Sequence, residues 1–185
     1  MLKSITIADG KIIRSPVVVD LSMSLALDVV RRDLGPLLPR LRRFARALTR
    51  HTEDADDLVQ IGVERALQRG DQWQVGTRLD SWVFRIMQNA WFDELRARRR
   101  GDQVLVDETL GEHVGVDPTD AQIDALAVRK AVASLGEDQR AVVSLVLVEG
   151  LAYKEAAEVL GIPIGTLTSR LARARDALQA QLTVS

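Results

Sequence analysis

The chain contains no cysteine and no long apolar run, and these two absences exclude several classes of protein. Without cysteine there is no disulfide, no thiolate metal site and no cysteine nucleophile. No apolar run approaches the roughly 20 residues that span a bilayer. Residues 1–20 also lack the charged segment, apolar run and cleavage site of a secretory signal. We therefore expect a cytoplasmic protein without membrane insertion.

Catalytic and metal-binding motifs are also missing. The only two histidines, His51 and His113, have no metal-ligand spacing, and no glycine-rich phosphate loop is followed by Lys and Ser or Thr. The acids at residues 53–57 lack the alternating spacing and the glycine of a calcium loop. The sequence therefore predicts no catalytic site, no metal and no cofactor.

The near-neutral net charge of -1 conceals an uneven distribution. Residues 31–100 carry 15 basic and 10 acidic side chains, whereas residues 101–128 carry seven acids and no base. Residues 129–185 carry seven basic and six acidic side chains. The chain thus has a basic segment, then an acidic segment, then a balanced one, and a basic segment is the usual electrostatic sign of nucleic-acid binding.

Hydrophobic periodicity predicts an all-α fold with two small helical domains. In residues 25–100, apolar side chains recur at three- and four-residue steps, which indicates three packed helices. Thr52 is expected to supply the capping oxygen of the second helix, which ends near Gln68. A third helix begins at Asp80 or Ser81 and ends in the arginines at residues 96–100.

The remaining segments complete the predicted organisation. Residues 101–121 form a flexible acidic linker without durable periodicity, and residues 122–185 return to the helical period as a second domain. Residues 1–24 are an extension, either disordered or folded as a hairpin around the β-prone stretch at residues 5–19.

Residues 151–175 have the pattern of a helix-turn-helix. A short helix with small Ala157 on its inner side is followed by Gly161, which permits a left-handed turn, by Ile162 as a buried plug, and by a second helix. The outer face of that second helix offers short polar groups and guanidiniums suited to base edges and phosphates. The predicted DNA contacts are Thr166, Thr168, Ser169, Arg170 and Arg173. The alternative is an ordinary helical hairpin with a solvated basic face.

The four arginines within residues 96–100 have two interpretations. They could complement the negative end of a helix dipole and remain solvated. Alternatively, since five of the seven aromatic residues lie in residues 73–92, they could form a phosphate-binding strip beside stacked bases.

Stretches in both predicted domains resemble the extracytoplasmic-function (ECF) group of bacterial RNA polymerase sigma factors. Residues 56–60 (DDLVQ) are similar to the family's conserved-region-two helix, and residues 81–86 (SWVFRI) with Asn89 and Asp93 resemble the helix before the promoter-melting loop. Residues 135–140 (LGEDQR) and 165–174 (GTLTSRLARA) look like region four. The resemblance covers about residues 30–182.

The resemblance implies a division of labour between a region 2-like domain at residues 25–100 and a region 4-like domain at residues 122–185. The second would place its helix-turn-helix on the minus-thirty-five element, and the first would hold a flipped base of the minus-ten element in a loop near residues 96–102. The minus-ten contacts would be Asn89, Arg96, Arg98, Arg99 and Arg100. The surface for core RNA polymerase would comprise Asp56, Asp57, Leu58, Gln60 and Glu64. The resemblance also implies promoter DNA and an anti-sigma protein as partners, and a stress or envelope-signal regulon.

Four residues depart from the family pattern. Ile61 and Gly62 stand where many relatives carry an acid and a small or β-branched residue, and Met87 and Trp91 are larger than the residues usual at those positions. Two other functions stay open on the residues alone. One is a helix-turn-helix regulator that binds an operator without polymerase, and the other is a sigma-like decoy that binds an anti-sigma protein.

Overall fold

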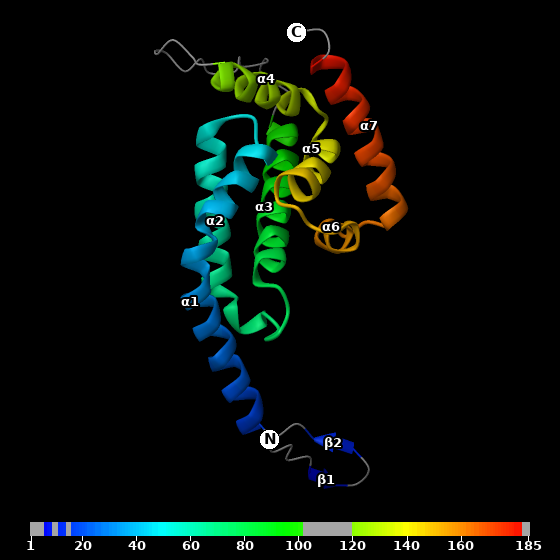
Figure 1. Ribbon diagram of the computed structural model, residues 1–185. Coiled ribbons are helices and arrows are strands. Elements are labelled where there is room, and N and C mark those ends of the chain that lie inside the picture. The colour runs from blue at the N-terminus through cyan, green and yellow to red at the C-terminus, as the bar shows by residue number, and fades with distance from the viewer. Residues whose placement is uncertain (1–5, 9–10, 14–15, 102–119, 183–185) are drawn as a thin grey trace.

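The computed structural model describes residues 6–8, 11–13, 16–101 and 120–182 of the 185-residue chain, and the described part is almost entirely helical (Figure 1). The first half contains the antiparallel pair β1 (Thr6–Ala8) and β2 (Lys11–Ile13), then α1 (Pro16–Leu48), α2 (Thr52–Gln68), a 3₁₀ turn at Gly70–Gln72, and α3 (Leu79–Gly101). The second half contains α4 (Asp120–Ser134), α5 (Glu137–Val143), a π-helical turn at Ser144–Val148, α6 (Tyr153–Leu160) and α7 (Ile164–Leu182). This order confirms the predicted all-α class and the two helical halves.

The three-helix half differs from expectation at its start. The strands β1 and β2 form the hairpin that was one of two alternatives for the extension, and α1 begins at Pro16, nine residues before the predicted start. Proline suits the first helical position because its missing N–H would be unpaired there and its φ is already helical. The following run of three valines at residues 17–19 favours a strand, so periodicity did not identify this part of α1.

The start of α2 shows that the capping prediction for Thr52 was wrong. Thr52 is the first residue of α2, the cap position is His51, and no side chain caps this end. The hydroxyl of Thr49, two residues before the cap, instead donates to the Ala45 carbonyl at 3.0 Å. The acids Glu53 and Asp54 do lie in the first turn, where the helix dipole stabilises them.

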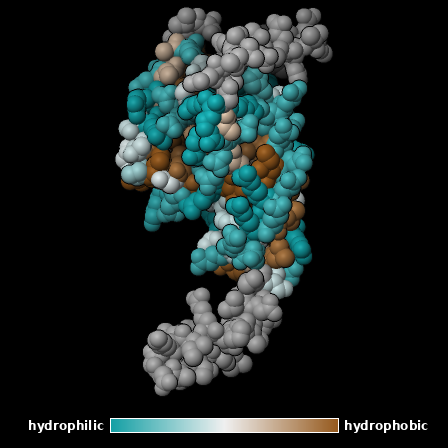
Figure 2. All heavy atoms as spheres, turned by 180° about the vertical axis from the view of Figure 1, so that it is seen from behind, coloured by the Kyte–Doolittle hydropathy of each residue, from teal (hydrophilic) through white to brown (hydrophobic). Residues whose placement is uncertain are grey.

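The two halves pack against each other around one main core. Phe44, Leu41 and Phe84 of the first half and Val142 and Leu171 of the second are each no more than 1% exposed and belong to the same cluster. Figure 1 shows α6 beside α3, α7 on the far side of α5 and α6, and α4 across the upper end. Polar side chains cover most of the opposite face, where apolar groups gather in a few patches (Figure 2). The predicted linker lies, apart from its ends, in residues 102–119, outside the described residues.

Candidate nucleic-acid interface

The helix-turn-helix is formed by α6, the turn at residues 161–163 and α7. Gly161 adopts φ +65° and ψ 32°, and the Ile162 N–H returns to the Ala157 carbonyl at 3.1 Å, which closes the end of α6. Ala156 and Ala157 are buried, and so are Leu167, Leu171 and Ala174 along the inner stripe of α7. Ile162 packs against the core and is partly buried. The predicted motif is therefore present with its turn glycine in the left-handed conformation.

The outer face of α7 carries the five predicted upstream contacts. Thr168, Ser169 and Arg173 are exposed, whereas Thr166 and Arg170 are half-buried. The Thr168 and Ser169 hydroxyls donate to carbonyls three residues earlier in their own helix, at 2.9 and 3.0 Å. Arg173 donates its Nε–H to the Ser169 carbonyl at 3.3 Å and forms no ion pair within the part of the chain that the structure describes. This face combines hydroxyl oxygens with a guanidinium, the chemistry that reads base edges and phosphates.

Arg170 is held against α5 in this arrangement. Its Nη2 lies 2.8 Å from a carboxylate oxygen of Asp138, in the first turn of α5. The Arg170 side chain is 25% exposed and that of Asp138 is 56% exposed. Because the pair is open to solvent, a phosphate could replace the carboxylate at little cost.

The arginine strip lies at the end of α3 and is exposed throughout. Arg98 donates to Asp54 of α2 at 2.6 Å and to Glu94 at 2.9 Å, and its guanidinium lies 5.5 Å from the centre of the Trp91 ring. Hydrogen bonds from Arg98 to both carboxylates raise the pKa of that guanidinium. Arg98 therefore fastens α3 to α2.

The other members of the strip are less constrained. Arg96 pairs with Asp93 at 2.9 Å, Arg100 donates to the carbonyl of Arg96, and Arg99 pairs with Glu137 of the second half. The predicted melting loop at residues 96–102 is helical as far as Gly101, and Asp102 lies outside the described residues. Asn89 is exposed earlier on α3.

The predicted polymerase surface divides into an exposed part and a buried residue. Asp56, Asp57, Gln60 and Glu64 are exposed on α2, and the Gln60 amide donates to Glu64 at 3.0 Å. Leu58 is only 2% exposed and packs in the main core, so its side chain is not available to a partner. The candidate polymerase surface is therefore limited to the four exposed acidic and polar residues.

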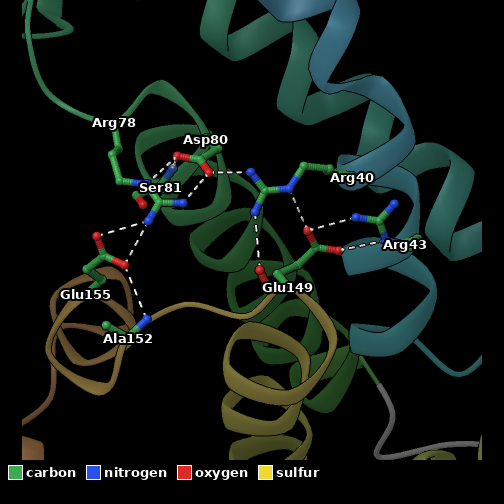
Figure 3. A network of polar contacts seen from close by, with 8 residues as sticks. All are labelled: Arg40, Arg43, Arg78, Asp80, Ser81, Glu149, Ala152 and Glu155. Atoms are coloured by element: carbon green, nitrogen blue, oxygen red, sulfur yellow. Dashed lines mark hydrogen bonds and ion pairs between the residues drawn. The ribbon is translucent and has the colours of Figure 1, made fainter.

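An ion-pair network between the halves was not anticipated from the sequence (Figure 3). The side chain of Glu149 is fully buried and pairs with two arginines of α1. It accepts a hydrogen bond from Arg40 Nε–H at 2.9 Å and lies 3.3 Å from Arg43 Nε. Arg78 pairs with Asp80 at 2.6 Å and with Glu155 of α6 at 2.9 Å. The sequence gives little indication of this network. Glu149 comes at the end of an apolar run, and that position by itself predicts neither a buried side chain nor an ion-pair partner.

Arg140 is a second unanticipated contact between the halves. Its side chain is 1% exposed and donates to three carbonyls, those of Leu48 at 2.7 Å, Ala133 at 3.0 Å and Leu135 at 3.2 Å. Since Leu48 ends α1, this guanidinium joins the C-terminus of α1 to the second half. Burial is the main cause that lowers the pKa of Arg140, to about 10.

Two further observations concern the described residues only. No group of three or more His, Asp or Glu side chains there is placed to hold a metal ion. None of the described helices has the length and apolar character needed to cross a membrane.

A helix-turn-helix with an exposed polar face, preceded by a three-helix domain with an arginine strip, defines a two-domain DNA-binding protein of the transcription-factor class. Residues 34–88 match the family model described as the Sigma2 domain of PhyR, and residues 125–178 match Sigma-70, region 4. The chain is 36% identical over 158 residues to the ECF RNA polymerase sigma factor EcfG of Rhodopseudomonas palustris, an alignment that covers 85% of this chain and 87% of the relative. The chain belongs to the ECF sigma factors.

Two further comparisons agree. The chain is 34% identical over 140 residues to the ECF sigma factor SigM of Mycobacterium tuberculosis, covering 75% of this chain and 69% of that one. Its fold is similar to that of the sigma factor RpoE from Bartonella quintana, solved in complex with the anti-sigma factor NepR. That likeness has a TM-score of 0.71 and 33% identity and covers 84% of this chain and 97% of RpoE.

Proposed function

We propose that this protein binds core RNA polymerase and directs it to promoter DNA, where it takes part in strand opening and transcription initiation without a catalytic site of its own. The observation that supports this proposal best is the exposed face of α7 on a correctly closed helix-turn-helix, in a chain whose first domain also matches a sigma domain. An operator-binding regulator leaves that first domain without a role. We also propose that the protein acts in the cytoplasm.

The roles of individual residues follow from their exposure. Thr166, Thr168, Ser169, Arg170 and Arg173 would contact the upstream element, and Asn89 with Arg96, Arg99 and Arg100 would contact the minus-ten element. Arg98 would contribute mainly by holding α3 against α2, since both carboxylates that it meets belong to its own chain. Asp56, Asp57, Gln60 and Glu64 would face the polymerase.

An anti-sigma protein is the proposed regulatory partner. The similar RpoE was solved with the anti-sigma factor NepR, and its sequence identity of 33% over 84% of this chain supports a partner of the same kind here.

Reconstitution with core polymerase tests the proposal. The purified chain is added to bacterial core RNA polymerase with DNA from its own upstream region, and holoenzyme formation and open-promoter formation are measured. Asp57→Arg should reduce polymerase binding, while Asp71→Arg, a reversal at an exposed acid outside the proposed surface, should not. Arg173→Ala should weaken promoter binding by about 1 to 3 kcal/mol if the guanidinium contacts a base, with Arg69→Ala as the control.

The outcomes separate the alternatives. Polymerase binding with strand opening supports a sigma factor. DNA binding that does not require polymerase would indicate an operator-binding regulator, and a folded chain that binds neither DNA nor polymerase would indicate a decoy.

A further inference from the structure

A groove of about 630 Å³ opens where the two halves meet, and arginines from both halves line it. Arg96 and Arg99 come from α3, Arg170 and Arg173 come from α7, and Arg50 follows the end of α1. Phe92 of α3 is half-buried and forms part of the wall. The predicted DNA-contacting arginines of two distant segments therefore share one concave surface.

The groove carries an excess of positive charge. Two lining carboxylates oppose the five guanidiniums, Glu137 paired with Arg99 and Asp138 paired with Arg170 at 2.8 Å. Arg50 and Arg173 form no ion pair with a carboxylate among the described residues. Arg96 is paired with Asp93, which is not part of the lining, so two positive charges remain uncompensated.

The buried guanidinium of Arg140 is not part of the lining but places a further positive charge near Arg50. Its hydrogen bonds go to neutral carbonyls alone, and it lies near enough to Arg50 for the two positive charges to oppose one another. Attraction to Glu137 is weaker than the repulsion from Arg50, so it offsets that repulsion only in part. Burial and Arg50 together lower the pKa of Arg140. An anion bound beside Arg50 would reduce the repulsion.

Size and shape decide which anion fits. A volume of about 630 Å³ falls within the roughly 300 to 1,000 Å³ of small-molecule sites. A DNA duplex is instead read by a convex element inserted into a major groove about 12 Å wide. Guanidinium forks bind phosphate oxygens in pairs, and half-buried Phe92 supplies the groove with an aromatic side chain, the kind of group against which a base packs.

We propose that this groove binds a small ligand with several phosphates, either a free polyphosphate or a nucleoside polyphosphate. Because the lining comes from both halves, such a ligand would favour the packed arrangement over any arrangement in which the halves separate. It would also compete with promoter DNA for Arg96, Arg99, Arg170 and Arg173, a consequence that rests on the proposed function.

Binding is tested by titrating the full chain with inorganic tripolyphosphate in a calorimeter at about 150 mM salt, where diffuse surface binding is screened. We expect one saturable site. Arg50→Ala combined with Arg99→Ala should weaken it at least tenfold, and Arg69→Ala, an exposed arginine outside the groove, should change it less than twofold. Absence of a saturable site, or an equal loss in the Arg69→Ala control, would overturn the proposal.

Two further measurements sharpen the test. Adenosine triphosphate binding more tightly than tripolyphosphate, with the difference lost in Phe92→Leu, identifies a nucleoside polyphosphate, while equal affinities identify the free polyphosphate.

The cysteine-free chain also accepts two dyes, at Gln68→Cys and Ala172→Cys, for energy transfer between the halves. Tripolyphosphate should narrow the distribution of energy-transfer efficiencies toward the value of the packed state. An unchanged distribution at saturation would disprove that the ligand holds the two halves together. Neither measurement contains polymerase or DNA, so their failure leaves the sigma function untouched.

Discussion

Gly62 and Met87 form a matched pair of residues in the interior of the first domain. A Cβ added at Gly62 would lie 2.5 Å from Met87 Cγ, closer than atoms in contact can approach. Met87 is fully buried and its Cγ lies in the middle of the side chain, so it cannot move aside freely. Two departures from the family pattern therefore compensate each other, because the larger side chain occupies the space that the glycine leaves on α2.

This pairing predicts strong coupling between substitutions at the two positions. Gly62→Ala should lower the free energy of unfolding by about 1 kcal/mol, since overpacking costs about 1 to 3 kcal/mol and the gain in helix propensity returns about 0.5 to 1 kcal/mol. In a Met87→Ala background the same change should be neutral or stabilising. Urea unfolding of the four proteins of the double-mutant cycle measures the coupling, and simple additivity would show that the contact is not limiting.

At the scale of the element, the two glycines around the helix-turn-helix have different roles. Gly161 has φ +65° and no atom within 4 Å of an added Cβ, so only backbone conformation demands a glycine. Gly165, in the first turns of α7, also has nothing within 4 Å but lies at an ordinary helical φ. Substitutions at these two glycines therefore separate the free-energy cost of a Cβ in the left-handed turn from the effect of an added Cβ on packing.

We expect Gly161→Ala to destabilise the protein by about 1 to 2 kcal/mol because a Cβ disfavours the left-handed region. Gly165→Ala should instead be neutral or stabilise by up to about 1 kcal/mol, since alanine restricts the unfolded chain more than glycine. Thermal unfolding followed by circular dichroism measures both. Equal effects of the two substitutions would contradict a special role for the turn.

At the scale of the whole molecule, polar contacts join the halves where the sequence shows two separate domains. Arg40 links Asp80 of α3 to Glu149 of the second half, and Arg78 links Asp80 to Glu155 (Figure 3). Glu155 also accepts the Ala152 N–H at the start of α6, at 3.2 Å. The position of the helix-turn-helix therefore depends on charges of the first domain.

Asp80 makes part of this stability depend on pH. Burial by itself would raise the pKa of Asp80, but hydrogen bonds from Arg78, Arg40 and the Ser81 N–H outweigh burial and lower that pKa to about 2, from 3.8. Because the folded protein holds the carboxylate in its charged form, this stabilisation is complete above about pH 4 and is lost as pH falls through 2. At 1.36 kcal/mol per pKa unit, the loss is about 2 kcal/mol.

Urea unfolding between pH 2 and 6 tests the role of Asp80. Asp80→Asn should be less stable than the wild type near neutral pH and should lose less stability on acidification. Asp71→Asn, at an exposed acid outside the network, should follow the wild-type profile. Parallel profiles for wild type and Asp80→Asn would show that this carboxylate carries no pH-dependent stability.

Glu149 is the residue on which the packing of the halves should depend most. Its side chain is fully buried, whereas those of Arg40 and Arg43 are 29% and 55% exposed, so loss of the Glu149 charge should cost about 1.5 to 3 kcal/mol, the value of a hydrogen bond to a charged group. Glu149→Gln should therefore favour separated halves, seen as a larger radius of gyration in solution scattering and faster amide exchange in α5. The control is Glu158→Gln, at an exposed acid whose side chain makes no ion pair among the described residues. Unchanged scattering and exchange in Glu149→Gln would exclude this dependence.

The sequence by itself determined the local elements and the faces they present. The two helices predicted on either side of Gly161 are present as α6 and α7, because hydrophobic periodicity and a turn glycine are local signals. The exposure of Thr168, Ser169 and Arg173 follows from the same periodicity, since polar residues on one side of a helix lie opposite its buried stripe.

Only the tertiary structure decided how the halves meet. Arg40 and Glu149 are 109 residues apart, and no periodic pattern connects positions so distant. Burial of Arg140 and of Leu58 was equally beyond local reasoning, because an arginine is ordinarily exposed and a motif says nothing of which member faces inward. The groove shared by arginines of both halves exists for the same reason, since complementary surfaces and paired charges arise only when the whole chain has packed.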